Sequence, residues 1–133
     1  MDTNTKTLNA ATCLLLAVSK ADNHIDNTEL NIIKDIIVDF FKIDSNNINN
    51  IINENLEILN EATDFYEFGK ILNNDFSYQD KIDFICCAFE VSFIDNESHH
   101  LEEHIIKKIA YILNVDRTDL MKSKNEMKKI FKL

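Results

Sequence analysis

Apolar residues recur along this chain at the three- and four-residue spacing of a helix face. Proline is absent and glycine occurs once, at Gly69. The sequence therefore has almost none of the glycine that tight β-hairpin turns require. The pattern therefore predicts an all-α fold, a compact bundle of about seven helices. We expect these helices at about residues 6–21, 27–42, 45–60, 63–75, 78–94, 99–114 and 117–131.

Three expected helix starts place a small side-chain acceptor three residues before a carboxylate, a pairing that satisfies free backbone amides. These pairs are Asp26 with Glu29, Ser77 with Asp80, and Asp116 with Asp119. The apolar stripes of two other helices are expected to face the core. The stripes consist of Ile48, Ile51, Ile52 and Leu59, and of Phe65, Phe68, Ile71 and Leu72.

The chain also aligns with itself without a gap in a register that pairs its first half with its second. The pairs include Cys13 with Cys86, Ser19 with Ser92, Asp22 with Asp95, Glu29 with Glu102, and Lys34 with Lys107. After deletion of one residue, residues 42–48 align with residues 114–120. The sequence thus predicts one domain over residues 1–133, with similar halves at about 7–60 and 77–131 joined by a helix at about 63–75.

Each half carries an acidic loop between its first two helices. The loops read ADNHIDNTEL (residues 21–30) and IDNESHHLEE (residues 94–103). In each, an Asp closes the first helix and a Glu follows seven positions later, in the first turn of the next helix. A helical wheel puts Glu29 and Glu102 beside the apolar stripe, so we expect both carboxylates to point partly inward.

These two loops, each between an apolar helix and a helix that begins E-x-x-I-I, resemble the signature of tellurite-resistance TerB-like domains, including their helical relatives in DnaJ-like membrane proteins. The glycine that follows each Asp in the family is Asn23 or Asn96 here, and asparagine also tolerates left-handed backbone. The resemblance covers about residues 8–120. It implies a seven-helix bundle with a two-fold pseudo-repeat, an acidic patch that binds a divalent cation, a link to chemical stress, and a cytosolic or membrane-associated protein partner.

The resemblance also implies which residues form the cation site. They are Asp22, Glu29, Asp95 and Glu102, with Asp26 and Glu97 as neighbouring candidates. Calcium and magnesium take several oxygen ligands, which paired carboxylates supply, and manganese and zinc are further candidates. The alternative is structural: the same carboxylates cap helix starts or bond to the opposite loop. The sequence leaves both interpretations open.

Other chemistry finds less support in the sequence. An EF-hand would need Gly at Asn27 and Glu at Ile33. His100 and His104 lie one helical turn apart and either share a metal ion with Glu103 or His99 or are solvated. The chain has no glycine-rich phosphate loop, and its cysteines sit in apolar runs. We therefore expect a non-enzymatic binding module, with a pure protein-interaction adaptor as the alternative and a small metal-dependent hydrolase as a remote one.

Charge and composition limit the kinds of partner that we expect and the location of the protein. With 23 acidic and 14 basic residues the formal charge is −9, which repels nucleic acids and anionic membrane surfaces. No stretch approaches the roughly 20 apolar residues of a membrane-spanning helix. Three cysteines with no evident pairing favour the reducing cytoplasm. We expect a cytoplasmic protein with a protein partner, without nucleic acid or membrane insertion, and we expect its asparagine-rich segment at residues 46–55 to lie on the surface.

Overall fold

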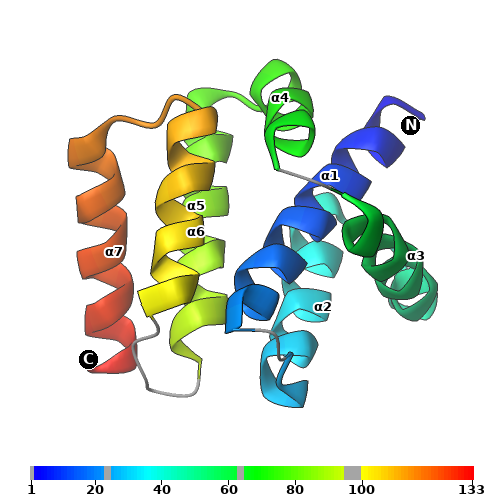
Figure 1. The fold of residues 1–133 in the computed structure, drawn as a ribbon, viewed down its shortest axis with the longest axis horizontal. Coiled ribbons are helices and arrows are strands. Elements are labelled where there is room, and N and C mark those ends of the chain that lie inside the picture. The colour runs from blue at the N-terminus through cyan, green and yellow to red at the C-terminus, as the bar shows by residue number, and fades with distance from the viewer. Residues whose placement is uncertain (1, 23–24, 63–64, 95–99) are drawn as a thin grey trace.

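The computed structural model describes residues 2–22, 25–62, 65–94 and 100–133, without the side chains of residues 2–4 and 22. These residues form seven α-helices and two short 3-10 turns, and none of them is in a strand (Figure 1). The elements are α1 (Asp2–Ser19), η1 (Lys20–Asp22), α2 (Asn27–Phe41), η2 (Ser45–Asn47), α3 (Ile48–Glu61), α4 (Tyr66–Asp75), α5 (Tyr78–Phe93), α6 (His100–Ile112) and α7 (Arg117–Phe131). The predicted all-α bundle is confirmed, with helix ends within a few residues of expectation.

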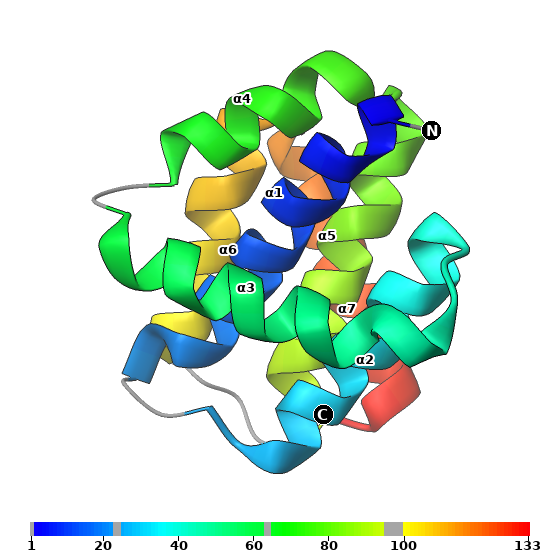
Figure 2. The ribbon, with the colours of Figure 1, turned by 90° about the vertical axis from the view of Figure 1, so that its right-hand side faces the viewer.

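Helix α1 is the centre of the bundle. Its residues from Ala10 to Ser19 are all buried, because this run is apolar or small on every side of the helix. α1 packs against α2, α3, α4, α5 and α6 (Figure 2). The predicted core stripes are also confirmed: Ile48, Ile52 and Leu72 are buried, and the other five residues pack against the core.

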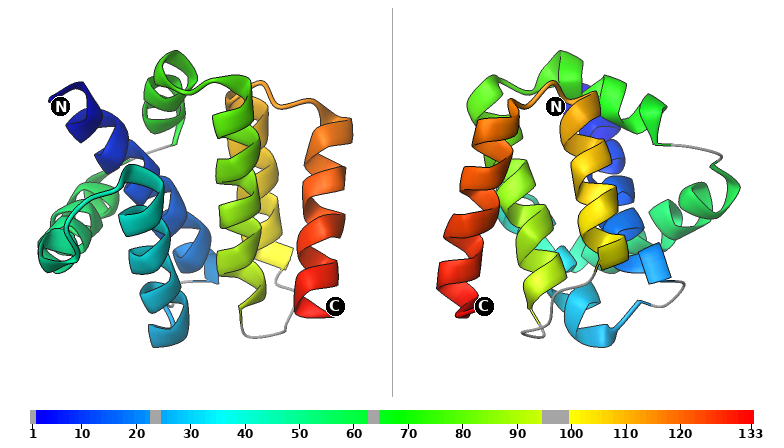
Figure 3. Two further views of the ribbon diagram at one scale, coloured as in Figure 1. Left: turned by 180° about the vertical axis from the view of Figure 1, so that it is seen from behind. Right: turned by 60° about the vertical axis from the view of Figure 1, so that its left-hand side comes forward.

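In each half the first helix packs on the second and the third. α1 packs on α2 and α3, and α5 packs in the same way on α6 and α7 (Figure 3). The halves also cross over, since α1 contacts α6 and α2 contacts α5. Helix α4 connects them and packs on α1 and α6.

The second helix of each half ends in the same way. Lys42 after α2 and Asn114 after α6 both have left-handed backbone, with φ of 54° and 61°. The next amides reach back to a carbonyl five residues earlier: Ile43 N to Val38 O at 3.3 Å, and Val115 N to Ala110 O at 2.9 Å. These bonds satisfy carbonyls at the helix end. The structure therefore agrees with the alignment of residues 42–48 with residues 114–120.

Of the three predicted pairs, Ser77 with Asp80 forms completely, Asp26 caps its helix without Glu29, and Asp116 forms no cap. The Ser77 hydroxyl and the Asp80 carboxylate exchange hydrogen bonds with each other's backbone amides, which is the expected capping box. The cap predicted at Asp116 is wrong, because its side chain accepts no cap hydrogen bond. Instead the Asp116 amide donates to Tyr78 Oη at 3.0 Å, and Tyr78 Oη donates to Asp119 at 2.5 Å. A tyrosine from α5 thus fixes the start of α7.

Gly69 permits the close approach of α4 to α6. A Cβ atom at this position would overlap Cγ2 of Ile112, whose branched side chain has little freedom to turn away. Glycine therefore serves here as the residue without a side chain in a helix crossing, and not as a turn residue.

The expectation that the asparagine-rich segment lies on the surface is wrong for one residue. Asn55 on α3 is fully buried against α1. Its side-chain amide donates to Asn9 Oδ1 at 3.1 Å and to Ile51 O at 2.8 Å, and its Oδ1 accepts from Cys13 Sγ at 3.2 Å. The other asparagines of the segment are exposed, namely Asn46, Asn47, Asn49, Asn50 and Asn53.

Candidate functional site

The ends of α1 and α5 and the starts of α2 and α6 all lie at one end of the bundle (Figure 1). The acidic loops connect these helix ends in the sequence. The turn η1, which closes the first half's first helix, packs against α6 of the second half (Figure 2). The structure thus brings η1, the turn that ends at Asp22, beside the helix that carries Glu102.

Asp26 has the capping role that the sequence predicts. It is the N-cap of α2, and its Oδ1 accepts a hydrogen bond from Thr28 N at 2.9 Å. The backbone at Asp26 is extended, as is usual at this position. One carboxylate oxygen of this candidate ligand is therefore used in starting the helix.

Glu29 points inward, as the helical wheel predicts. Its exposed fraction is 3 %, and its Oε1 accepts a hydrogen bond from Ser19 Oγ at 2.7 Å. A hydrogen bond to a carboxylate is stronger than one between neutral groups, and burial strengthens it further. The Ser19–Glu29 bond therefore joins the end of α1 to the first turn of α2.

The corresponding pair in the second half is also buried. Glu102 is 1 % exposed and Ser92 is fully buried. Within the described part of the chain, Ser92 Oγ has no hydrogen-bond partner, so the serine–glutamate bond of the first half is not repeated. The inward direction predicted for Glu102 is confirmed. Asp95 and Glu97 lie outside the described residues, as do Asn23, Asn96 and the side chain of Asp22.

The second metal hypothesis receives no support from the histidines on α6. His100 and His104 are exposed, while Glu103 is nearly buried and forms an ion pair with Lys124 of α7 at 2.6 Å. No group of three or more potential metal ligands gathers among the described residues. The carboxylate expected to complete a zinc site instead holds α6 to α7. His99 lies outside the described residues.

The cysteines are free thiols with raised pKa values. Burial raises the pKa of Cys13 to about 11. Burial, and then the neighbouring Glu90 carboxylate, raise the pKa of Cys87 to about 12. Burial also raises the pKa of Cys86, against a hydrogen bond with Ser123. Since the thiolate is the nucleophile, these thiols are poor candidates for covalent catalysis.

An acidic cluster that the sequence analysis missed lies between α2 and α5. Burial, together with the carboxylates of Asp35 and Asp39, raises the pKa of Glu90 above its ordinary 4.5. The folded state therefore holds the Glu90 proton more tightly than the unfolded chain does. The ionised carboxylate lowers stability, and this loss develops as the pH rises from 4.5 through the folded-state pKa.

We expect Glu90→Gln to be more stable than the parent at pH 7 and equally stable near pH 4. The gain should be a few tenths of a kcal/mol, because water screens charges on half-buried side chains. Urea unfolding at both pH values measures the gain, and Glu57→Gln is the matched control, because Glu57 is exposed on α3. If Glu90→Gln is no more stable than the parent at pH 7, neither burial nor the carboxylates of Asp35 and Asp39 destabilise the ionised Glu90.

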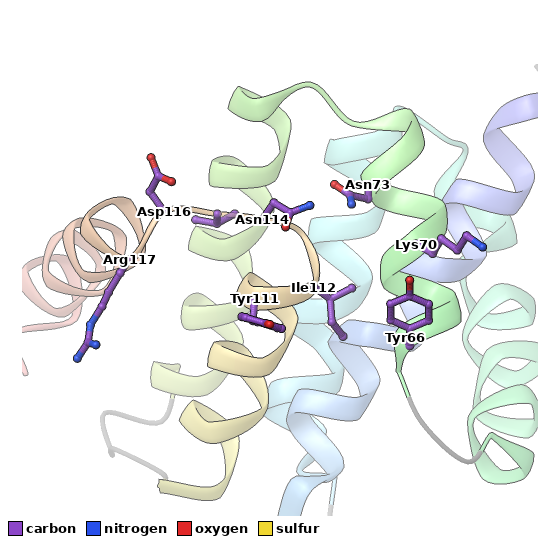
Figure 4. Close-up of a pocket in the computed structure, with 9 residues that line it drawn as sticks. Tyr66, Lys70, Asn73, Tyr111, Ile112, Asn114, Asp116 and Arg117 are labelled. Carbon is purple, nitrogen blue, oxygen red and sulfur yellow. The ribbon is translucent and has the colours of Figure 1, made fainter.

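A hollow of about 660 Å³ opens at the other end of α6, where α4, α6 and the start of α7 meet. Tyr66 and Tyr111 lie on either side of Ile112, and Arg117 extends on the α7 side of Tyr111 (Figure 4). Sequence reasoning missed this site because its residues come from three helices. The one signal was Tyr111, a large aromatic residue on the polar side of its helix, which is 83 % exposed.

Among the described residues, no helix combines the length and the hydrophobicity that crossing a bilayer requires. No curated protein and no solved structure matches the chain significantly. The family model of the tellurite resistance protein TerB, in contrast, matches residues 8–125. This match runs from α1 into α7 and includes both acidic loops. The chain therefore belongs to the TerB family.

Proposed function

We propose that this protein is a non-enzymatic binding module of the TerB family that takes up a divalent cation between its two acidic loops and acts through a protein partner in a response to tellurite or other chemical stress. The observation that carries the proposal is the pair Glu29 and Glu102. These carboxylates occupy corresponding positions in the two halves, and both are buried in the first turns of α2 and α6, which begin at the same end of the bundle.

The chemistry of the donor set fits a hard cation. Burying a carboxylate is unfavourable unless a cation or hydrogen-bond donors compensate its charge. Calcium, magnesium and manganese prefer several oxygen ligands, and zinc also accepts carboxylates. The ligands in this proposal are Asp22, Asp26, Glu29, Asp95, Glu97 and Glu102. A bound cation would neutralise the acidic loops and link the two halves.

A second function, a protein-interaction adaptor without a metal, is favoured by the contacts of Asp26 and Glu29. Asp26 caps α2, and Glu29 accepts the Ser19 hydroxyl. Both contacts give these carboxylates a structural role that needs no cation. In this case the acidic loops only shape one end of the bundle, and the function of the protein consists of binding its protein partner.

Thermal unfolding of chelator-treated protein in the presence of calcium, magnesium, manganese or zinc distinguishes the two functions. A cation that binds only the folded state adds about 1.4 kcal/mol of stability at ten times its dissociation constant. We expect at least one of these ions to raise the melting temperature. The double variant Asp22→Asn, Asp95→Asn should lose this rise, since it removes one carboxylate from each loop.

The double variant Asp44→Asn, Asp116→Asn provides a matched control. It removes the same charge from the corresponding links of the two halves, and asparagine keeps the capping ability of Asp44, which accepts from Asn46 N at 3.0 Å. This control should respond to the cation as the parent does. If no ion raises the parent's melting temperature, cation binding is excluded and the adaptor function stands in its place.

A further inference from the structure

Tyr111 stands between two hollows on the surface formed by α4, α6 and α7. It lines the hollow of about 660 Å³ beside Tyr66 and also a second one of about 450 Å³ between α6 and α7. The second hollow has an apolar lining of Ala110, Val115, Leu120 and Met121. Volumes of this size accommodate side chains of a ligand or partner. We call these two hollows, with Tyr111 between them, the Tyr111 surface.

The first half offers an internal comparison. A hollow lies at the corresponding place between α2 and α3, and Lys34, Val38, Ser45 and Ile48 line it. The repeat pairs these residues with Lys107, Tyr111, Arg117 and Leu120 of the second hollow. Val38 is thus replaced by an exposed tyrosine and Ser45 by an arginine. Of these two corresponding hollows, the one in the second half has the tyrosine and the additional cation.

The charges of the two hollows are opposite. Asp35 and Asp39 outnumber Lys34 in the first half's hollow, whereas Lys107, Arg117 and Lys124 line the second-half hollow without a carboxylate. Lys70 adds a further cation beside Tyr66, and Asp116 is the one carboxylate of the Tyr111 surface. Lys124 is paired with Glu103, but Lys107 and Arg117 are exposed. A cationic surface on a chain of net charge −9 favours an acidic ligand locally, since charges beyond about 8 Å are screened at physiological salt.

We propose that the Tyr111 surface docks an acidic segment of a partner protein, one in which apolar anchor side chains are flanked by carboxylates. The anchors enter the hollows on either side of Tyr111, and the carboxylates meet Lys107 and Arg117. Tyrosine and arginine are the residue types that most often dominate binding energy at such surfaces, and Met121 adapts its shape to the anchors. This inference specifies the partner in the proposed function and does not depend on cation binding.

Selection from a library of random short peptides tests the proposal directly. The full chain is the bait, chelator is present throughout, and the Tyr111→Ala variant serves for counter-selection. We expect the enriched peptides to combine Asp or Glu with aromatic or aliphatic residues. Fluorescence anisotropy with one enriched peptide should show binding that weakens about tenfold or more in Tyr111→Ala and in Arg117→Glu, and that weakens further with salt.

The controls separate docking from folding. Tyr111 is exposed and Arg117 begins α7, where a glutamate is compatible with the helix dipole, so both variants should keep the parent's circular dichroism and melting temperature. Ser45→Glu makes the corresponding change in the first half and should leave peptide binding unchanged. The proposal is overturned if the enriched peptides are basic or neutral. It is also overturned if no peptide binds the parent better than the Tyr111→Ala variant. A dimer in sedimentation that Arg117→Glu dissociates also overturns it, because the occupant would then be a second copy. Because chelator removes divalent cations, the peptide experiment tests docking independently of the cation experiment.

Discussion

Replacing Leu15 by alanine is expected to lower the free energy of unfolding by about 3 kcal/mol. Leu15 is fully buried on α1, the helix against which five other helices pack. Truncation removes apolar contacts and leaves a cavity that the surrounding helices cannot easily fill, because each also packs on other elements. Such a loss is a large fraction of the stability of a domain of this size.

Urea unfolding followed by circular dichroism measures this loss. Leu101→Ala on α6 is the matched control, because Leu101 is 58 % exposed and its truncation should change stability by no more than about 0.5 kcal/mol. Equal losses for the two variants would contradict the central position of α1.

The fold was largely predictable because its strongest signals are local. Apolar residues at helical spacing mark the helices, and small or apolar residues fill the run from Ala10 to Val18, which is buried at the centre of the bundle. The predicted cap at Asp116 failed for the opposite reason. Its amide bonds to Tyr78, a residue far away in sequence, and local patterns do not show such a contact.

The features of the candidate site also divide into those that local sequence patterns predict and those that depend on tertiary packing. The inward direction of Glu29 and Glu102 follows from the helical wheel, and the repeat identifies them as a pair. The Ser19–Glu29 bond, the raised pKa of Glu90 and the hollow beside Tyr111 each depend on how separate helices meet. Spacing along the chain cannot supply that geometry.

Asn55 is the clearest case of a residue whose role the local pattern concealed. Five exposed asparagines precede it in the same segment, yet its own side chain is completely buried. It donates to Asn9 on α1 and to the Ile51 carbonyl within α3, and it accepts from the Cys13 thiol. Buried polar groups that satisfy one another fix the position of the helices that carry them.

We expect Asn55→Ala to lower the free energy of unfolding by about 2 kcal/mol, because it removes the buried side-chain amide that bonds to Asn9, the Ile51 carbonyl and the Cys13 thiol, and it opens a small cavity. Urea unfolding gives the loss, and Asn53→Ala provides the matched control, since Asn53 is exposed on the same helix. If both variants unfold at the parent's urea concentration, water replaces the Asn55 amide and the network does not hold α3 to α1. A loss confined to Asn55→Ala means that a polar residue in an otherwise surface-like segment determines how the third helix joins the central one.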